Sequence, residues 1–293
     1  MKSGFVSIIG RPNVGKSTLL NNILGKKVAI TSNKPQTTRN NIQGVYNDSD
    51  YQIIFVDTPG IHKPKNKMGK YLNKQAYFSV SDVDVILFLV DVTKSLGTGD
   101  KFVINTLKET NKPVILILNK IDKIPKDKIL PKIEQYMTLY DFSEIIPVSA
   151  LKHDNLDRLI DVIKSYMKDT VKYYEDGEIT NVSKEFMITE FVREKIFNLT
   201  DEEVPHSITC VIESMEEKKE SAVIYVNIIV DRDNLKKIII GNNGKMIKQI
   251  GIEARADIER LLGKKVYLNL FVKTIKKWRD KEDYLSELGF KTE

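Results

Sequence analysis

The chain has 293 residues, of which 41% are hydrophobic and 29% are charged, and its net charge is +6. This composition supplies apolar side chains for two globular domains and excludes a largely disordered chain, while the single cysteine, Cys210, excludes a disulfide framework. The longest apolar run, around residues 85–90, is far shorter than the ~20 residues of a spanning helix, and a strand-like stretch begins almost at once. We therefore expect a soluble, cytoplasmic protein without a signal peptide, and we expect Cys210 to be a small buried residue.

A phosphate-binding loop is the first motif along the chain. A predicted buried strand over 5–9 leads into GRPNVGKS at 10–17, and a helical pattern follows. Glycines in this spacing let backbone N–H groups surround a β-phosphate, and the helix N-terminus adds its positive dipole end. We expect Lys16 to reach the β- and γ-phosphates and Ser17 to offer its hydroxyl to Mg²⁺. The predicted nucleotide contacts in this loop are Gly10, Arg11, Pro12, Asn13, Val14, Gly15, Lys16, Ser17 and Thr18.

A second hydroxyl for Mg²⁺ is expected between the first helix and the next strands. The segment KPQTTRNN at 34–41 offers Thr37 and Thr38, and the sequence alone does not separate them. Thr38 is preferred because Arg39 and a predicted strand over 42–46 follow it. The segments 34–41 and 61–70 are polar and rich in Gly, Pro and Lys, so we expect mobile switch loops that the γ-phosphate orders.

The turn DTPG at 57–60 follows a predicted strand over 51–56. An aspartate at the end of a strand beside the phosphate loop is placed to hold Mg²⁺ through water, and the Gly60 N–H is placed to sense the γ-phosphate. The predicted metal set is Ser17, Thr38 and Asp57. The predicted nucleotide contacts in this turn are Asp57, Thr58, Pro59, Gly60 and Ile61.

Two further strand ends predict which base is bound. After the strand over 113–118 come Asn119, Lys120 and Asp122, and a carboxylate in the last position accepts the two donors that guanine has and adenine lacks. The strand that ends at 148 places the backbone of Ser149, Ala150 and Leu151 near the base. Four motifs in this order, each after a strand, predict a GTPase that binds GTP and GDP with Mg²⁺.

The residue that usually orients the attacking water is absent. Many GTPases place a glutamine directly after the Asp-x-x-Gly turn, and this chain has Ile61, which forms no side-chain hydrogen bond. The alternatives are His62, a water oriented by backbone groups, a group from a partner, or a potassium ion. Asn13 points to potassium, because GTPases with this pair of residues resemble potassium-assisted enzymes, although it is also a simple turn residue. We expect slow intrinsic hydrolysis. The predicted catalytic set is Asn13, Lys16, Thr38 and Gly60.

The pattern changes after about residue 172. A charged linker is predicted over 173–184, and the periodicity that follows predicts helix, strand, strand, helix, helix, strand. The two strands are expected to be joined by the charged turn MEEKKE at 215–220. The predicted domains are therefore a GTPase domain over 1–172 and a second domain over 185–293.

A G-x-x-G turn, GNNG at 241–244, lies between two predicted short helices of the second domain. With this element order it indicates a type II KH domain, whose turn clamps about four nucleotides of single-stranded RNA, with DNA not excluded. Residues 231–282 hold 14 Lys and Arg against 7 Asp and Glu, a net of +7, so the rest nets about −1. A polyanion partner fits this charge. The alternative interpretation of the charge is a solvated basic surface, and the alternative interpretation of GNNG is a plain helix–helix turn. The predicted RNA contacts are Ile240, Gly241, Asn242, Asn243, Gly244, Lys245, Ile247 and Lys248, with Ile239 also expected in the groove.

These motifs together resemble the Era-like family of P-loop GTPases over nearly the whole chain. The resemblance is carried by GRPNVGKST, KPQTTR, DTPGIHKPK, NKID, SALK, IIIGNNGKMIKQIG, LNLFVKTIKKWRD and YLSELGF. It implies an α/β P-loop GTPase fold, a mostly parallel sheet with helices on both faces, followed by an α+β type II KH domain.

The resemblance also implies a function. It implies binding of the 3′ end of 16S ribosomal RNA, a GTP-dependent checkpoint role in maturation of the 30S subunit, and peripheral association with the inner face of the cell membrane. We expect a monomer. Two alternatives stay open: a membrane-associated regulatory GTPase with secondary RNA binding, and an RNA-binding module whose GTPase domain does not hydrolyse GTP.

Overall fold

The computed structural model describes residues 1–61, 64 and 66–288, and these residues form two compact units. The first unit contains the described residues up to Asn181 except a short segment at 66–68. The second unit contains that segment and residues 182–288. Within these described ranges, no helix is both long enough and apolar enough to cross a lipid bilayer.

The first unit is built on a six-stranded sheet in the order β2-β3-β1-β4-β5-β6. Only β2 runs antiparallel to its neighbour, and the other pairs are parallel. Both faces of such a sheet are covered, so its strands are continuous apolar runs such as VILFLVD in β4. The strands are β1 (Lys2–Gly10), β2 (Ile42–Asn47), β3 (Tyr51–Asp57), β4 (Val85–Asp91), β5 (Val114–Asn119) and β6 (Glu144–Val148).

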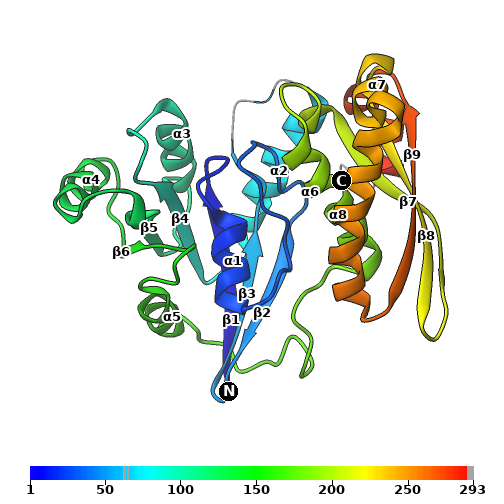
Figure 1. Cartoon of the computed structure of the whole chain (residues 1–293). Coiled ribbons are helices and arrows are strands. Elements are labelled where there is room, and N and C mark those ends of the chain that lie inside the picture. The colour runs from blue at the N-terminus through cyan, green and yellow to red at the C-terminus, as the bar shows by residue number, and fades with distance from the viewer. Residues whose placement is uncertain (62–63, 65, 289–293) are drawn as a thin grey trace. The chain divides into compact units, whose positions relative to one another are not determined.

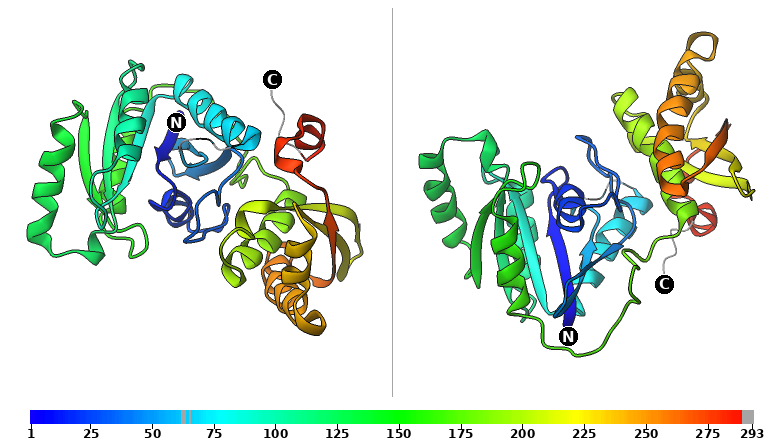
Figure 2. Two further views of the ribbon diagram at one scale, coloured as in Figure 1. Left: turned by 90° about the horizontal axis from the view of Figure 1, so that it is seen from above. Right: turned by 60° about the horizontal axis from the view of Figure 1, so that its bottom comes forward.

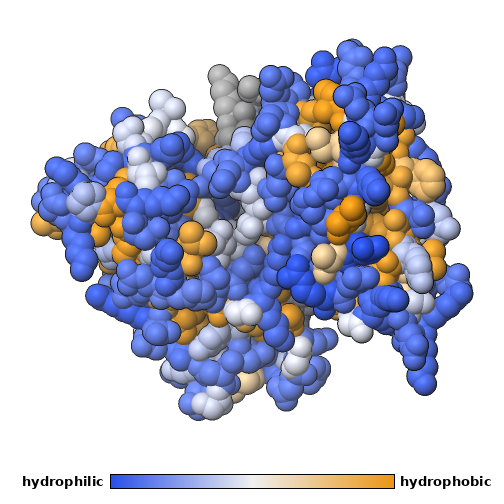
Figure 3. Space-filling model, viewed as in Figure 1, coloured by the Kyte–Doolittle hydropathy of each residue, from blue (hydrophilic) through white to orange (hydrophobic). Residues whose placement is uncertain are grey.

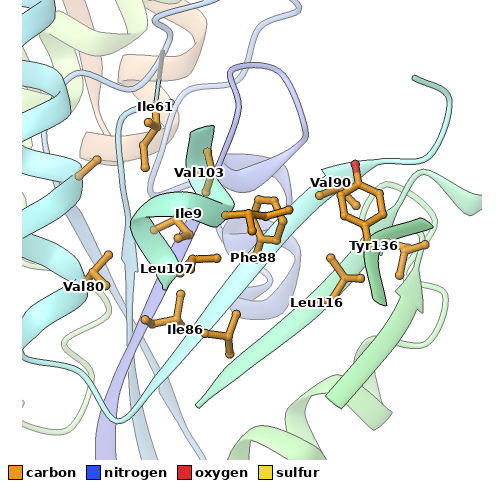
Figure 4. Packing of buried hydrophobic residues seen from close by; sticks show 14 of the residues in the cluster. Ile9, Ile61, Val80, Ile86, Phe88, Val90, Val103, Leu107, Leu116 and Tyr136 are labelled. Atoms are coloured by element: carbon orange, nitrogen blue, oxygen red, sulfur yellow. The ribbon is translucent and has the colours of Figure 1, made fainter. Parts of the chain in front are cut away.

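Helices cover both faces of this sheet, as predicted. Helices α2, α3 and α4 bury apolar side chains on β1, β4 and β5 in one core cluster, shown in Figure 4, and Figures 1 and 2 show α1 on the opposite face. The helices are α1 (Lys16–Leu24), α2 (Lys67–Ser81), α3 (Thr98–Leu107), α4 (Ile129–Met137) and α5 (Leu156–Lys164).

The expected loop over 61–70 is wrong in its last part, because α2 begins at Lys67. Met68, Leu72, Ala76 and Val80 are buried at helical spacing along α2, and Ala76 and Val80 belong to the core cluster on the sheet. The polar and lysine-rich residues between them hid this apolar stripe from the sequence analysis.

The segment after α5 runs along the outer strands of the sheet. The backbone N–H groups of Tyr173 and Tyr174 donate to the buried Gln52 side chain at 2.7 and 3.0 Å. Further on, Thr180 forms an antiparallel bridge with Gly44 of β2. Much of the predicted linker over 173–184 is therefore hydrogen-bonded to the sheet, although its boundaries stay a prediction.

The second unit packs helices on one face of a three-stranded sheet in the order β7-β8-β9, and Figure 1 shows α6 and α8 on the same side. Strands β7 and β8 are antiparallel, and β8 and β9 are parallel, as the predicted element order requires. Cys210 is buried in β7. The elements are α6 (Lys184–Leu199), β7 (Ile208–Glu217), β8 (Ser221–Val230), α7 (Asp233–Ile240), α8 (Lys245–Leu262), β9 (Lys265–Thr274) and α9 (Glu282–Glu287).

One predicted detail of this unit is wrong. The charged turn expected over 215–220 is shorter, because β7 continues through Glu217 and takes up a bulge between Ile212 and Ser214. The helix predicted after the GNNG turn is present as α8, which has 18 residues. Charged residues on the open face of an edge strand are compatible with strand structure, so charge alone did not mark the strand end.

Candidate functional site

Three oxygen-bearing side chains meet where β1 and β3 end. The Ser17 hydroxyl lies 2.9 Å from the Thr38 hydroxyl, and the two donate to Asp57 Oδ2 at 2.6 and 3.2 Å. Asp57 is fully buried, and its Oδ1 has no hydrogen-bond partner among the described residues. Hard oxygen donors around an unsatisfied buried carboxylate fit Mg²⁺. The structure thus brings together the predicted metal set, with Thr38 in it and not Thr37, whose hydroxyl donates to Lys34 O at 2.7 Å.

Lys16 lies buried in the phosphate loop. Its Nζ donates to the carbonyl oxygens of Arg11 and Gly10 at 3.2 and 3.4 Å. Burial lowers the pKa of Lys16 to about 8, and attraction to Asp57 opposes that shift. Burial likewise raises the pKa of Asp57 above its ordinary value. Among the described residues, the ammonium's hydrogen bonds are to these two neutral carbonyls, so the loop is electrostatically prepared for an anionic phosphate group.

A pocket opens over the phosphate loop and also reaches residues 30–32 and 36–38. From the predicted nucleotide set it is lined by Pro12, Asn13, Gly15, Lys16, Ser17, Thr18 and Gly60.

The DTPG turn packs directly on the phosphate loop. A Cβ at Gly60 would lie 2.8 Å from the Pro12 backbone, so only glycine fits there. The Thr58 hydroxyl donates to Ile8 O at 2.8 Å, and Pro59 is buried with it. The Ile61 N–H donates to Gly10 O at 3.2 Å.

Ile61 points into the core beneath the turn. Its side chain is 1% exposed and belongs to the cluster that α2 and α3 cover (Figure 4). A side chain in that position packs and does no chemistry, which agrees with the missing water-orienting group. The alternative catalytic residue, His62, lies outside the described residues.

Asn119, at the end of β5, joins three loops. Its Nδ2 donates to Val14 O at 2.8 Å, and its Oδ1 accepts the N–H groups of Lys120 and Ala150 at 2.8 and 3.0 Å. A Cβ at Gly15 would lie 2.4 Å from this amide. Asn119 therefore braces the phosphate loop against the loops that face the base.

The base-side residues are held by side chains from other segments. The Ser149 hydroxyl donates to Asp122 Oδ1 at 2.6 Å, and Asn22 donates to Ala150 O at 2.6 Å. Leu151 is 62% exposed, so its side chain lies at the surface of the site. Ser149 thus orients the carboxylate that is predicted to read guanine.

Arg11 and Asn13 are engaged within the protein. The Arg11 guanidinium donates to Asp100 at the start of α3, at 2.7 Å, so this side chain is directed to α3. Asn13 has a left-handed backbone, with φ of 64°, and its side chain donates to Asn33 O. Its own carbonyl accepts from Lys120 Nζ at 2.8 Å.

The GNNG turn presents backbone and charge. Gly241, Asn243 and Gly244 all have left-handed φ values of 70°, 51° and 74°. A Cβ at Gly241 would lie 2.6 Å from Met246 Cβ. Helix α8 starts directly after the turn, its N-cap Gly244 offers no side-chain cap to the first N–H groups, and the neighbouring Lys245 is exposed. This geometry is suited to phosphate. The other predicted contacts Asn242 and Lys248 are exposed too.

Both halves of the chain match known proteins. A model of the 50S ribosome-binding GTPase family matches residues 5–120, and a KH domain model matches residues 203–279. Two solved structures each match with 44% identity, full coverage of both chains and a TM-score of 0.96. One is Era in complex with MgGDPNP and nucleotides 1506–1542 of 16S ribosomal RNA, and the other is a variant of Era from Aquifex aeolicus bound to GDP·AlF4⁻. The chain belongs to the Era family of GTPases.

Era family membership confirms the predicted fold of a P-loop GTPase domain followed by a KH domain. One residue expected in the groove of that KH domain is placed elsewhere: Ile239 is fully buried in the core and presents no surface to a ligand. Ile240 and Ile247 are half-buried beside the turn, where they are available for contact. Adjacent residues of a helix point about 100° apart, so the run III could not all face one groove.

Several residues that shape the two Era-type sites were missed. Asp91, at the end of β4, accepts from Lys120 Nζ at 2.7 Å, and its place at a strand end was a usable signal. Gly251 lies on the side of α8 that faces Leu270 of β9. A glycine inside a helix lowers stability, so its presence in the sequence was a signal of close packing at this position. Figure 3 shows hydrophobic side chains at the surface of the KH unit. Ile238 and Ile252 of this unit are about half exposed.

Proposed function

We propose that this chain hydrolyses GTP in its first unit, binds the 3′ end of 16S ribosomal RNA through the GNNG turn, and acts as a GTP-dependent checkpoint in maturation of the 30S subunit. The full-length match to an Era structure that holds MgGDPNP and 16S nucleotides together carries the proposal. The presence of both sites in one chain supports it.

In this proposal the phosphate loop surrounds the triphosphate and Lys16 neutralises its β- and γ-oxygens. The hydroxyls of Ser17 and Thr38 hold Mg²⁺, and Asp57 acts through a bound water. The metal supplies charge neutralisation at the phosphates. Asp122 selects guanine, because its carboxylate would face no matching donor pair on adenine.

Intrinsic hydrolysis is proposed to be slow. Ile61 is buried in the core and brings no polar group to the attacking water, which supports a potassium ion or a partner as the source of the missing positive charge. The steady-state rate in potassium buffer should exceed the rate in sodium buffer at equal ionic strength. A fast rate in sodium without a partner would contradict this account.

Nucleotide and RNA are proposed to be thermodynamically coupled. The γ-phosphate orders the switch segments, the GTP state favours RNA binding, and hydrolysis releases the RNA. Linkage is reciprocal, so RNA must tighten GTP binding by the factor by which GTP tightens RNA binding.

The deciding experiment measures GTP hydrolysis in potassium buffer with and without an RNA that copies the 3′ end of 16S ribosomal RNA. The matched control is the double variant Gly241→Asp/Gly244→Asp. If RNA raises the wild-type rate and the variant shows no rise, the checkpoint proposal stands. If RNA binds through the turn without any change in rate, the two domains are independent modules. Absence of turnover would favour an RNA-binding module with a non-hydrolysing GTPase domain.

A monomeric, cytoplasmic protein with peripheral association to the inner face of the cell membrane is also proposed. The net charge of +7 over residues 231–282 supports attraction to an anionic surface. Light scattering tests the monomer. Binding to anionic vesicles that resists competing RNA would favour the alternative in which a membrane is the main target.

A further inference from the structure

A basic pocket lies at the far end of α8 from the GNNG turn. Helix α8 leaves the turn at Lys245 and ends at Leu262, just before β9 begins, as Figure 1 shows. Its 18 residues span ~27 Å at the usual helical rise. The pocket at this end is lined by Arg255, Glu259, Arg260, Lys264, Lys265 and Tyr267, among others. We call it the α8-end pocket.

The charges in the α8-end pocket do not cancel. Arg260 pairs with Asp257, and Lys264 pairs with Glu217 at 2.9 Å. Glu259 accepts the Val266 N–H at 3.1 Å.

Two cations of the pocket are left over. Arg255 and Lys265 are exposed, and within residues 1–61, 64 and 66–288 neither lies within ion-pair distance of a carboxylate. Beside them the Tyr267 side chain is 60% exposed. Unpaired cations next to an open aromatic ring are the combination that holds single-stranded nucleic acid, because the cations bind phosphates and the ring stacks a base.

The α8-end pocket and the GNNG turn lie at opposite ends of the same helix, α8. Strand β9 is an edge strand of the sheet, and α8 packs beside it with Gly251 against Leu270 halfway along. A strand of RNA that leaves the turn along α8 therefore arrives at Arg255, Lys265 and Tyr267.

We propose that the α8-end pocket binds the continuation of the RNA strand whose first part the GNNG turn holds. This inference rests on the proposed function. A KH turn clamps only about four nucleotides, whereas the related Era complex contains nucleotides 1506–1542. Phosphates bind Arg255 and Lys265, and one base stacks on Tyr267.

The test compares two RNAs by fluorescence anisotropy over a range of salt concentrations. The short RNA has about four nucleotides, the length that the GNNG turn can hold. The long RNA has the sequence of nucleotides 1506–1542. Tyr267→Ala should weaken the long RNA about tenfold. Arg255→Gln/Lys265→Gln removes two phosphate contacts. For the long RNA, the steepness of the negative slope of log K against log salt should therefore decrease by about 1.4. Neither variant should change binding of the short RNA, which also shows that the unit is folded.

The matched control is Lys126→Gln/Lys128→Gln, which removes the same charge from exposed positions of the first unit and should leave the long-RNA slope unchanged. Wild-type affinity and slope in both pocket variants would overturn the proposal. Loss of binding to phosphatidylglycerol vesicles with unchanged RNA binding would overturn it in favour of a membrane contact. Failure of Gly241→Asp/Gly244→Asp to weaken either RNA would instead refute the proposed function itself.

Discussion

The phosphate loop and the GNNG turn both use glycine and lysine, but they are built in opposite ways. At the phosphate loop, buried polar side chains hold one another: Ser17, Thr38 and Asp57 lie within hydrogen-bond distance, and Asn119 braces the loop from behind. At the GNNG turn, left-handed backbone and exposed lysines form the surface. The first site should therefore be sensitive to the loss of a polar group, and the second to the gain of a side chain.

The largest effect is expected from Lys16→Ala. Removal of the Lys16 ammonium, which lies buried among the phosphate-loop carbonyls, should lower kcat for GTP about 100- to 1,000-fold, as for the loss of one preorganised charge donor. Thermal stability should not fall, because the wild-type lysine is buried and its pKa is lowered to about 8. Steady-state hydrolysis and a melting curve check the two parts. Wild-type turnover in this variant would show that the phosphate loop is not sensitive to the loss of a polar group.

A smaller effect should separate two neighbouring threonines. Thr38→Ala should weaken Mg²⁺-dependent binding of a GTP analogue about tenfold, because one charge-assisted oxygen contact is lost. Thr37→Ala should leave that affinity unchanged, since the Thr37 hydroxyl is used by Lys34 O. Titration calorimetry at fixed magnesium gives both constants, and GDP serves as the control ligand. Equal losses in the two variants would argue against the assignment of Thr38.

The two glycines of the GNNG turn provide a matched pair for the second site. Gly244→Ala should cost ~1–2 kcal/mol of unfolding free energy, the price of left-handed backbone, because nothing lies within 4 Å of the added Cβ. Gly241→Ala should cost more, since its Cβ would meet Met246 at 2.6 Å. Urea unfolding of the two variants measures the difference. The comparison fails if Gly244→Ala proves the more destabilising of the two.

The smallest effect concerns acid stability. Burial alone would raise the pKa of Asp91, but hydrogen bonds from Lys120 and Thr93 outweigh it, and the net pKa lies below the ordinary value of 3.8. Asp91 therefore stabilises the fold above about pH 3.8, and this contribution is lost as pH falls through the lowered folded pKa.

Asp91→Asn should cost less than about 1 kcal/mol at neutral pH, because this ion pair is partly exposed. The stability curves of variant and wild type should converge in acid. Parallel curves down to the lowest pH would show that Asp91 carries no such contribution.

The parts of the fold that the sequence predicted are those with local causes. The spacing of the phosphate loop, the turn after β3 and the strand ends required only neighbouring residues. The choice between Thr37 and Thr38, by contrast, depends on Asp57, which is far along the chain. The pairs Arg11–Asp100 and Lys120–Asp91 join segments that only the folded sheet brings together.

The errors have the same origin. Ile239 and Ile240 are chemically alike, and only the packing of α7 decides which one is buried. The first turn of α2 was hidden because lysines alternate with its buried residues, so the loop composition outweighed the apolar spacing. The packing role of Gly251 depends on Leu270 of β9, which neighbouring residues in the sequence do not reveal.

The segment that runs along β2 has a practical consequence for dissecting the protein. Strand β2 is the last strand of its sheet, and Ile179 O accepts the Val45 N–H at 2.9 Å, so the segment satisfies bonds that would otherwise be open. An uncovered strand of this kind recruits other chains and promotes aggregation. A GTPase fragment that ends at residue 172 would expose the edge of β2 and should aggregate. A fragment that continues through Asn181 would keep this edge covered and should remain soluble.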